Sequence, residues 1–407
     1  MISAPMCKSS WMTGGIPADR VIPSRTKRAA KVFSLYFQSF RPCGISRHGL
    51  FLSPRRDSLL ENQPEIDDIN EVSLSFFSPV TNPPVSTLIV SYNTRNLLDG
   101  CLRSLRRIAE DLPLDVIVVD NASTDGSALH VRTHFPEVRI IPNEKNIGFA
   151  AAVNRGMSEV HSSFVFVLNP DTIVPRETIQ KLLNYIKMDE KCALVGANLT
   201  NPDGSMQASI FRFPSLFREF WNFLPEIKLL LRFQKLGTYV HSIHVPEDRN
   251  AKAAEEAGAV ECISGAAFLM RTEAFKSVGG MDERFFLYHE EMDLCTRMRR
   301  AGWQIRAHRT AQVIHFDAQA SGYTPKRLPN APVLNWRIGG MDLLWQKHKP
   351  GLKHTLWRVQ AKGLLRFRIG LCFLALPFSG KQRLIRKKRI GELVSVVTML
   401  RGNGCCT

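Results

Sequence analysis

The chain has 407 residues, of which 44% are hydrophobic and 22% charged, a composition that supports a sizeable folded core. Its longest apolar run, residues 370–378, is nine residues long, far short of the roughly 18–20 that cross a bilayer. The nine cysteines include no Cys-x-x-Cys pair and are scattered through apolar runs. These features argue against a membrane-spanning protein and against a disulfide framework, and they are typical of a cytosolic protein with reduced thiols.

The net charge of +17 is concentrated at the two ends. Residues 1–56 carry ten Lys or Arg against one acid, residues 57–84 carry six acids, and residues 346–407 carry fourteen Lys or Arg against one acid. Residues 1–84 lack sustained periodicity, so we expect a disordered extension, either similar to a transit peptide or an over-extended start. The basic C-terminal end is where an anionic partner would bind.

Short apolar runs and helical patterns alternate from residue 85 onward. The runs predict strands at 85–91, 114–119, 138–141 and 163–168. Helical patterns lie between them, at 95–109, from about 124, and at 147–160. Such alternation predicts an α/β fold with a mostly parallel central sheet and helices on both faces.

The alternation weakens after about residue 193, and the predicted elements become more varied. The sequence favours a hairpin turn at 201–204, one strand over 260–270, a helix over 289–300 and two short strands within 303–314. The aromatic and then charged stretch 211–258 is interpreted as a lid or an acceptor loop.

Polar residues follow three of the predicted strands. Asn93, Asp120 and the Asn169-Pro-Asp171 segment each come directly after an apolar run. Ligands of open α/β sheets bind beyond the carboxyl ends of the strands. The sequence therefore predicts a ligand site at this edge of the sheet.

Seven motifs occur in order between residues 89 and 295. They are Ile-Val-Ser-Tyr-Asn at 89–93, Val-Val-Asp-Asn-Ala-Ser-Thr-Asp-Gly-Ser at 118–127, Asn-Glu-Lys-Asn-Ile-Gly-Phe at 143–149, Leu-Asn-Pro-Asp at 168–171, Ser-Gly-Ala-Ala-Phe-Leu-Met-Arg at 264–271, Gly-Gly-Met-Asp-Glu-Arg-Phe-Phe at 279–286 and Glu-Glu-Met-Asp-Leu-Cys at 290–295. This ordered set resembles family 2 glycosyltransferases of the GT-A fold, especially the rhamnosyltransferase-like branch that builds bacterial surface polysaccharides.

The resemblance covers residues 85–322 and leaves 323–407 as a basic, largely helical C-terminal region. It implies inverting transfer of a sugar from a nucleoside diphosphate sugar to a saccharide or lipid-linked acceptor. Deoxythymidine diphosphate rhamnose is the donor that the resemblance favours. A catalytically weakened protein that binds nucleotide sugars or carbohydrates is the alternative.

The resemblance also implies which residues bind the donor. Asp120 would accept hydrogen bonds from a pyrimidine ring or ribose, and Asn93 and Asn146 would lie near the nucleotide. The small residues Ser264 and Gly265 would let the backbone approach a sugar closely. The alternatives are a helix-capping turn at Asp120, a turn before Gly148 for Asn146, and tight internal packing at 264–265.

Asn169-Pro-Asp171 occupies the place where the family often has Asp-x-Asp. By resemblance, Asp171 would bind a divalent cation, Asn169 would contact the sugar or ribose, and His315 would complete the metal site. Hard oxygen ligands suit magnesium or manganese, and the cation would offset the charge of the diphosphate. A plain turn at 169–171, and a surface or core role for His315, are the alternatives.

Glu290 and Glu291 are the predicted catalytic residues. Inverting transfer needs a base within reach of the attacking hydroxyl. The family usually has Asp where this chain has Glu291, so we expect Glu291 to be the base and Glu290 to orient the acceptor. The alternative is an acidic first turn favoured by the helix dipole, with Asp293 ion-paired to Arg297.

Apolar and basic residues interleave within 364–374, and residues 381–389 add six bases. This pattern is typical of an interfacial helix on an anionic membrane surface, which would bring the enzyme to a lipid-linked acceptor. The sequence therefore favours a cytoplasmic protein, peripheral on the inner face of the plasma membrane. A helix packed on the catalytic domain is the alternative, and with no nucleic-acid motif present we expect no nucleic acid partner.

Overall fold

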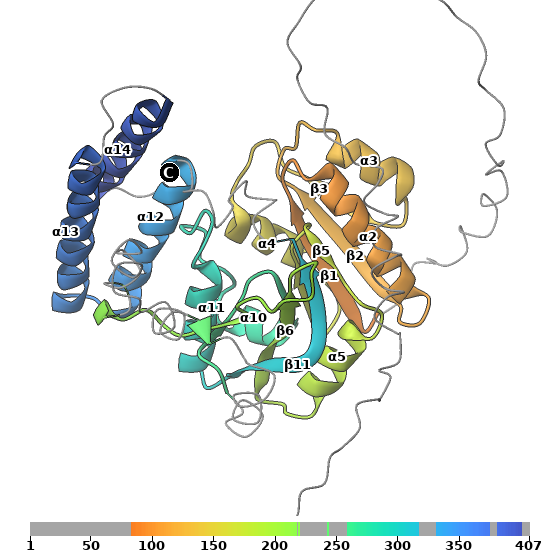
Figure 1. Cartoon of the computed structure of the whole chain (residues 1–407). Coiled ribbons are helices and arrows are strands. Elements are labelled where there is room, and N and C mark those ends of the chain that lie inside the picture. The colour runs from red at the N-terminus through yellow and green to blue at the C-terminus, as the bar shows by residue number, and fades with distance from the viewer. Residues whose placement is uncertain are drawn as a thin grey trace, which may run out of the picture. The chain divides into compact units, whose positions relative to one another are not determined.

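The fold is taken from a computed structural model, which describes residues 83–217, 219, 242–243, 259–316, 331–374 and 381–400 (Figure 1). The predicted extension 1–84 therefore lies almost entirely outside the described residues, as does most of the predicted lid or acceptor loop at 211–258.

An eight-stranded sheet forms the centre of the region from residue 85 to residue 315, with strand order β3-β2-β1-β4-β10-β6-β11-β5. The strands are β1 (Val85–Ser91), β2 (Leu114–Asp120), β3 (Arg139–Pro142), β4 (Phe164–Leu168), β5 (Thr172–Ile173), β6 (Cys192–Thr200), β10 (Ala267–Arg271) and β11 (Gln304–His315). Strands β3, β2, β1 and β4 pair in parallel. Strand β10 runs antiparallel to both β4 and β6, and β11 is parallel to β6. The carboxyl ends of β1, β2, β4, β6 and β11 therefore share one edge.

The helices cover the sheet on both faces, because side chains of successive strand residues point to opposite faces and both sets are apolar (Figure 1). One face packs against α2 (Arg95–Ala109), α3 (Ser127–His134) and α5 (Thr178–Lys187). The other packs against α4 (Phe149–Met157), α10 (Thr272–Ser277) and α11 (Glu290–Arg300). The predicted fold class is confirmed: a mostly parallel sheet between two helical layers.

Two predicted strands differ from the structure. The expected single strand over 260–270 is broken into β9 (Cys262–Ile263) and β10, which belong to different sheets. Strand β9 pairs with β7 (Ile210–Phe211), which also pairs with β8 (Ser242–Ile243). The two short strands expected within 303–314 form the single strand β11, whose register on β6 shifts between Ala307 and Gln312. A bulge of this kind keeps a strand continuous across a local irregularity.

Three helices follow the sheet region in the sequence: α12 (Ala331–His348), α13 (Leu352–Leu374) and α14 (Lys381–Met399). Their apolar side chains form a separate core that includes Trp345 of α12, Trp357 of α13 and Val396 of α14. Leu344 of α12 instead joins the core beneath α11. No helix in the described ranges is both long and apolar enough to cross a membrane.

Candidate active site

Asp120 ends β2 at the edge of the sheet where the sequence predicts a ligand site, and it is buried. Its Oδ2 accepts a hydrogen bond from the backbone nitrogen of Ser123 at 3.1 Å. Its Oδ1 is buried and has no hydrogen-bond partner among the described residues. A buried carboxylate oxygen is costly to leave unpaired, so this atom suits a donor group on a ligand, such as a pyrimidine N–H or a ribose hydroxyl.

Asn93 links the loop after β1 to the loop after β2. Its Oδ1 accepts a hydrogen bond from the backbone nitrogen of Thr124 at 2.7 Å, and its own backbone nitrogen donates to Ser123 Oγ at 2.9 Å. The residue has a φ of 54°, a left-handed conformation that asparagine tolerates better than most residues. Asn93 therefore lies beside the Asp120 loop, as the sequence predicts, and its amide oxygen holds the two loops together.

A chain of polar groups, which runs from the buried Asn121 and Asn143 to the exposed Arg155, supports the next loop and was missed by the sequence analysis. Asn121 donates to the backbone oxygen of Gly148 at 3.1 Å, Asn143 donates to Asn121 at 2.6 Å, and Arg155 donates to Asn143. Gly148 has a φ of +85°, and a Cβ there would lie 2.6 Å from the backbone oxygen of Phe286. Fully paired networks of this kind fix a single loop conformation.

Asn146 takes part in the same turn. Its Oδ1 accepts a hydrogen bond from the backbone nitrogen of Gly148 at 3.0 Å. This contact is the turn role that the sequence left as the alternative, and contact with a nucleotide stays a prediction.

Asp171 and His315, both buried, lie together although they are far apart in the sequence. Pairing of β5 with β11 sets Thr172 opposite His315, which brings His315 Nε2 to 3.4 Å from Asp171 Oδ1. Asn169 starts the same segment, and its backbone nitrogen donates to Ala266 at 2.8 Å. The structure thus brings together the two residues predicted to bind a metal.

Gln207 determines which nitrogen of His315 carries the proton. The Gln207 amide nitrogen donates to the backbone oxygen of His315 and to Asn201 Oδ1, each at 2.7 Å. Its Oε1 must then accept from His315 Nδ1, 2.9 Å away. In a neutral His315 the lone pair on Nε2 consequently faces the Asp171 carboxylate.

This arrangement fits a divalent cation shared by Asp171 and His315. Two electron-pair donors 3.4 Å apart attract a cation between them, and adjacent ligands of an octahedral magnesium ion lie roughly 3 Å apart at metal–oxygen distances of about 2.1 Å. The described ranges contain no group of three or more His, Cys, Asp or Glu side chains suited to a metal. Magnesium commonly takes its remaining ligands from substrate phosphates and water.

Residues 264–266 connect the two sheets and lie against Glu291. Placed on Gly265, a Cβ would lie 3.7 Å from Glu291 Cβ and 3.8 Å from its Cγ. Ser264 donates its backbone nitrogen to Ser209 at 2.9 Å, and its hydroxyl accepts the backbone nitrogen of Ala266 at 3.3 Å. The structure therefore places the small residues against the predicted base rather than inside a strand.

The backbone just before α11 is strained. Tyr288 and His289 both have positive φ, 75° and 73°, which costs of order 1–3 kcal/mol for a residue other than glycine. Helix α12 supports the turn, because His289 Nε2 lies 3.0 Å from the Arg337 backbone oxygen. Gly340 of α12 also approaches so closely that a Cβ there would lie 2.9 Å from the Tyr288 oxygen. The strain sets the direction in which the first turn of α11 presents its carboxylates.

Glu290 and Glu291 have unusual acidity. Burial, reinforced by the neighbouring charge of Glu291, raises the pKa of Glu290 well above its usual value. Glu290 Oε2 is buried with no hydrogen-bond partner among the described residues. Burial also raises the pKa of Glu291 to about 7, although backbone hydrogen bonds oppose the shift. A carboxyl group whose pKa lies near 7, as that of Glu291 does, can take up a proton at neutral pH, as a general base must.

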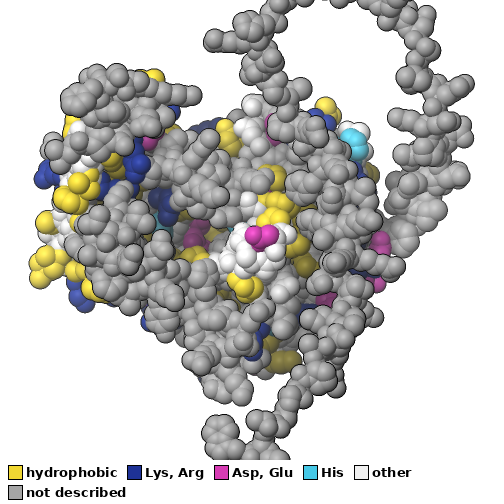
Figure 2. Space-filling model, viewed as in Figure 1, with side chains coloured by type: hydrophobic (Ala, Val, Ile, Leu, Met, Phe, Trp, Pro, Cys, Tyr) yellow, Lys and Arg dark blue, Asp and Glu magenta, His cyan; other side chains and the backbone are white. Residues whose placement is uncertain are grey.

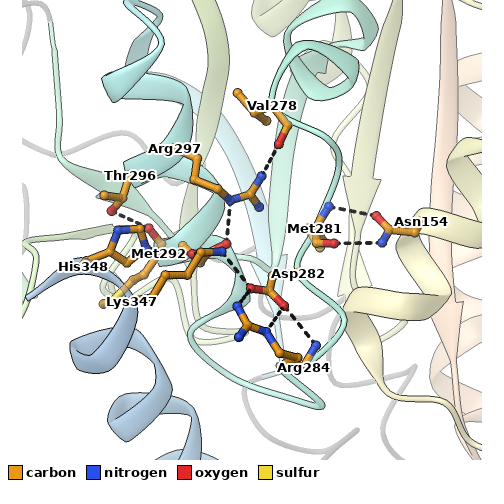
Figure 3. Close-up of polar contacts among 11 residues, drawn as sticks. Asn154, Val278, Met281, Asp282, Arg284, Met292, Thr296, Arg297, Lys347 and His348 are labelled. Atoms are coloured by element: carbon orange, nitrogen blue, oxygen red, sulfur yellow. Dashed lines mark hydrogen bonds and ion pairs between the residues drawn. The ribbon is translucent and has the colours of Figure 1, made fainter. Parts of the chain in front are cut away.

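Asp293 lies on the same helix but belongs to an ionic network (Figure 3). Its carboxylate is fully buried and contacts Arg297 Nε at 2.7 Å, Lys347 Nζ at 2.8 Å and His348 Nε2 at 2.7 Å. Burial alone would raise the pKa of Asp293, but these partners lower it overall. Lys347 also pairs with Asp282 at 2.7 Å. The Asp293–Arg297 pair, the alternative that the sequence left open for this segment, is confirmed, and α12 adds two partners, Lys347 and His348, that the sequence did not predict.

Comparison with known proteins identifies the family of the chain. The model of glycosyl transferase family 2 matches residues 86–278. N-acetylglucosaminyl-diphospho-decaprenol L-rhamnosyltransferase of Mycobacterium tuberculosis is 30% identical over 255 residues, which cover 58% of this chain and 77% of that protein. Low-salt glycan biosynthesis hexosyltransferase Agl10 of Haloferax volcanii is 24% identical over 236 residues, covering 57% of this chain and 66% of that protein.

Among solved structures, the mannosyltransferase PcManGT from Pyrobaculum calidifontis in complex with GDP-Man and Mn²⁺ aligns with a TM-score of 0.48 at 16% identity, over 80% of this chain and 88% of that one. The identification rests on the shared sequence. With the ordered motifs, the sheet topology and a 30% identical relative covered over 77% of its length, the chain belongs to family 2 of the glycosyltransferases and is a glycosyltransferase.

Proposed function

We propose that this glycosyltransferase is an inverting, metal-dependent enzyme that transfers rhamnose from a nucleoside diphosphate sugar to a saccharide or lipid-linked acceptor in surface polysaccharide synthesis. Support for rhamnose and for the acceptor comes from the relative named N-acetylglucosaminyl-diphospho-decaprenol L-rhamnosyltransferase. Support for donor binding comes from Asp120, whose buried Oδ1 has no hydrogen-bond partner among the described residues.

One observation carries the proposal. The segment 264–266 contacts the proposed base on one side and the proposed diphosphate site on the other. Gly265 lies along the Glu291 side chain, and the Ala266 oxygen accepts the backbone nitrogen of Asn169 at 2.8 Å. A donor bound at Asn169 and Asp171 would therefore have its sugar next to Glu291.

Each residue then has a defined part. Glu291 takes the proton of the attacking hydroxyl, because its pKa of about 7 leaves it partly ionised at neutral pH. Glu290, whose pKa is raised by burial and by the neighbouring charge of Glu291, orients the acceptor. Asp171 and His315 would hold magnesium or manganese, which supplies positive charge to the diphosphate as it leaves. Asn93, Asn146 and Ser264 shape the loops around the donor.

The test is a transfer assay on the purified full chain. It uses deoxythymidine diphosphate rhamnose within a panel of nucleotide sugars, N-acetylglucosaminyl diphosphoryl polyprenol as acceptor, and manganese, magnesium or a chelator. We expect rhamnose transfer with inverted anomeric configuration, abolished by the chelator. Retention of configuration, or binding of nucleotide sugars without turnover, would contradict the proposal.

Two variants test the residue roles. Glu291→Gln should lower kcat by at least about 100-fold with little change in donor affinity, since a general base contributes that much. Glu190→Gln removes a carboxylate from an exposed position and is the matched control. Asp171→Asn should weaken binding of the cation, so that transfer requires a higher metal concentration. Transfer that survives Glu291→Gln would reject this base, and unchanged metal dependence in Asp171→Asn would reject this cation site.

A further inference from the structure

Helix α13 has an apolar face that packs inward. Trp357, Ala361 and Leu365 recur every four residues and are fully buried. They pack with apolar side chains of α12 and α14, including Trp345 and Val396. This face accounts for how α13 is held in the three-helix cluster.

A second apolar face of α13 points outward. Five large apolar side chains on α13 are exposed: Leu352 at 73%, Leu356 at 46%, Val359 at 64%, Phe367 at 48% and Phe373 at 56%. At about 100° per residue they fall within a sector of about 120°, opposite the inward face. The stripe is about 32 Å long, at about 1.5 Å per residue. Isolated exposed apolar residues are ordinary, but an aligned row of this length is not.

The surroundings of this stripe are basic. Helix α13 contains five Lys or Arg and no acid. Lys353 and Arg366 are exposed within or beside the stripe, and Lys387 and Lys388 are exposed on α14, which packs against α13. Figure 2 shows hydrophobic and basic side chains intermixed on this part of the surface.

We propose that the outward face of α13 (Leu352, Leu356, Val359, Phe367 and Phe373) is the surface with which this protein lies on an anionic lipid bilayer. The apolar stripe enters the boundary between headgroups and acyl chains, and the flanking bases contact lipid phosphates. A second copy of this chain fits less well, because pairing two such faces would bring their like charges together.

The exposed apolar face of α13 is longer than the interfacial pattern that the sequence predicts. The interfacial pattern expected at 364–374 included Leu365, which is buried, whereas the exposed face starts a full twelve residues earlier, at Leu352. The bilayer contact itself does not depend on the donor or the sugar. Its use, to bring the active site to a lipid-linked acceptor, rests on the proposed function.

The experiment is vesicle flotation of the full chain with phosphatidylglycerol-containing or purely phosphatidylcholine vesicles. We expect binding to the anionic vesicles that weakens with salt. Leu356→Glu with Val359→Glu should lower the partition coefficient at least about tenfold, because it puts two charges into the stripe. The matched control is Leu129→Glu with Met188→Glu, which changes two apolar residues, on α3 and after α5, that are even more exposed than Leu356 and Val359.

Equal binding by both double variants would reject α13 as the contact face, and failure of the wild type to bind would reject the bilayer. A concentration-dependent dimer that the α13 variant abolishes would show self-association instead and overturn the proposal. Sugar transfer to a water-soluble acceptor should be unchanged in the α13 variant, which shows that it is folded. Failure of transfer in the wild type would count against the proposed function and leave the vesicle result standing.

Discussion

At the scale of single residues, Gln207 connects three groups around the proposed cation site. It donates to the backbone oxygen of His315 and to Asn201, and it accepts from His315 Nδ1. Partners behind a metal-ligating histidine fix its tautomer and ring orientation. Gln207 is thus expected to act through His315, as a positioning residue.

Gln207→Leu should therefore weaken cation binding about 10- to 100-fold while nucleotide binding without metal is preserved. Manganese is titrated into each variant in the presence of a nucleoside diphosphate, and electron paramagnetic resonance measures the concentration of the free ion. Gln180→Leu, on the exposed side of α5, is the matched control. Equal manganese affinity in the two variants would show that Gln207 does not position His315 for cation binding.

The sequence placed Asp171 and His315 in one site, but it did not predict Gln207, the partner of His315. Each follows an apolar strand and resembles a family position, so local pattern and motif were enough to select it. Gln207 follows no strand pattern and meets His315 across 108 residues of chain. Its backbone nitrogen donates to Leu199 of β6, so its contact with His315 depends on the pairing of β6 with β11, a register that local periodicity does not contain.

At the scale of elements, α12 supports the first turn of α11. Gly340 contacts Tyr288, and His289 contacts the backbone of Arg337. At the far end of α12, Lys347 and His348 pair with Asp293. A glycine in the middle of a helix normally costs about 1 kcal/mol relative to alanine. Its presence at Gly340 is explained by this close approach of two backbones.

Gly340→Ala should consequently be harmful despite the better helix propensity. Its Cβ would lie 2.9 Å from the Tyr288 oxygen, so α12 or the strained turn must shift. We expect kcat to fall at least about tenfold with unchanged donor affinity, because small displacements of a catalytic group are costly. Stability, from urea unfolding, should fall by about 1–3 kcal/mol.

Gly391→Ala on α14 is the matched control, because a Cβ there meets nothing within 4 Å. It should leave kcat unchanged and raise the free energy of unfolding by up to about 1 kcal/mol. Matching effects of the two substitutions on kcat would contradict a supporting role for α12.

The sequence-based prediction of strands was wrong where strand pairing, rather than the local sequence pattern, determines the structure. Residues 260–270 are apolar enough for one strand, yet β9 and β10 pair with strands of different sheets. The break falls at 264–266, and it is this turn that contacts Glu291. In contrast, the helix over 289–300 was predicted within one residue, since its acidic start and basic end are local signals.

At the scale of the whole molecule, two carboxyl groups of the proposed active site destabilise the folded chain, and interactions elsewhere in the fold offset this cost. Glu290 and Glu291 are buried carboxyl groups with raised pKa values, so their ionisation opposes folding. Asp293 is the opposite case, because its partners lower its pKa and its charge favours folding. One helix therefore carries a stabilising carboxylate next to destabilising ones, the usual trade between stability and activity.

The pH dependence of stability follows from these signs. At low pH, Glu291 is protonated in both the folded and the unfolded chain. As the pH rises above about 4.5 the unfolded chain ionises first, so the free energy of unfolding falls until the folded group ionises near pH 7. Above pH 7, where Glu291 is ionised in both the folded and the unfolded chain, it lowers the free energy of unfolding no further. A Glu291→Gln variant, which cannot ionise, should escape this loss.

We therefore expect Glu291→Gln to match the wild type in urea unfolding at pH 5 and to exceed its stability by about 1–3 kcal/mol at pH 8. The exposed Glu190→Gln control should show no such pH-dependent difference. If Glu291→Gln were destabilised by the same amount at both pH values, its carboxylate would be a structural group that the fold needs. A variant more stable at pH 8 yet inactive would instead identify Glu291 as a residue kept for its chemistry at a cost in stability.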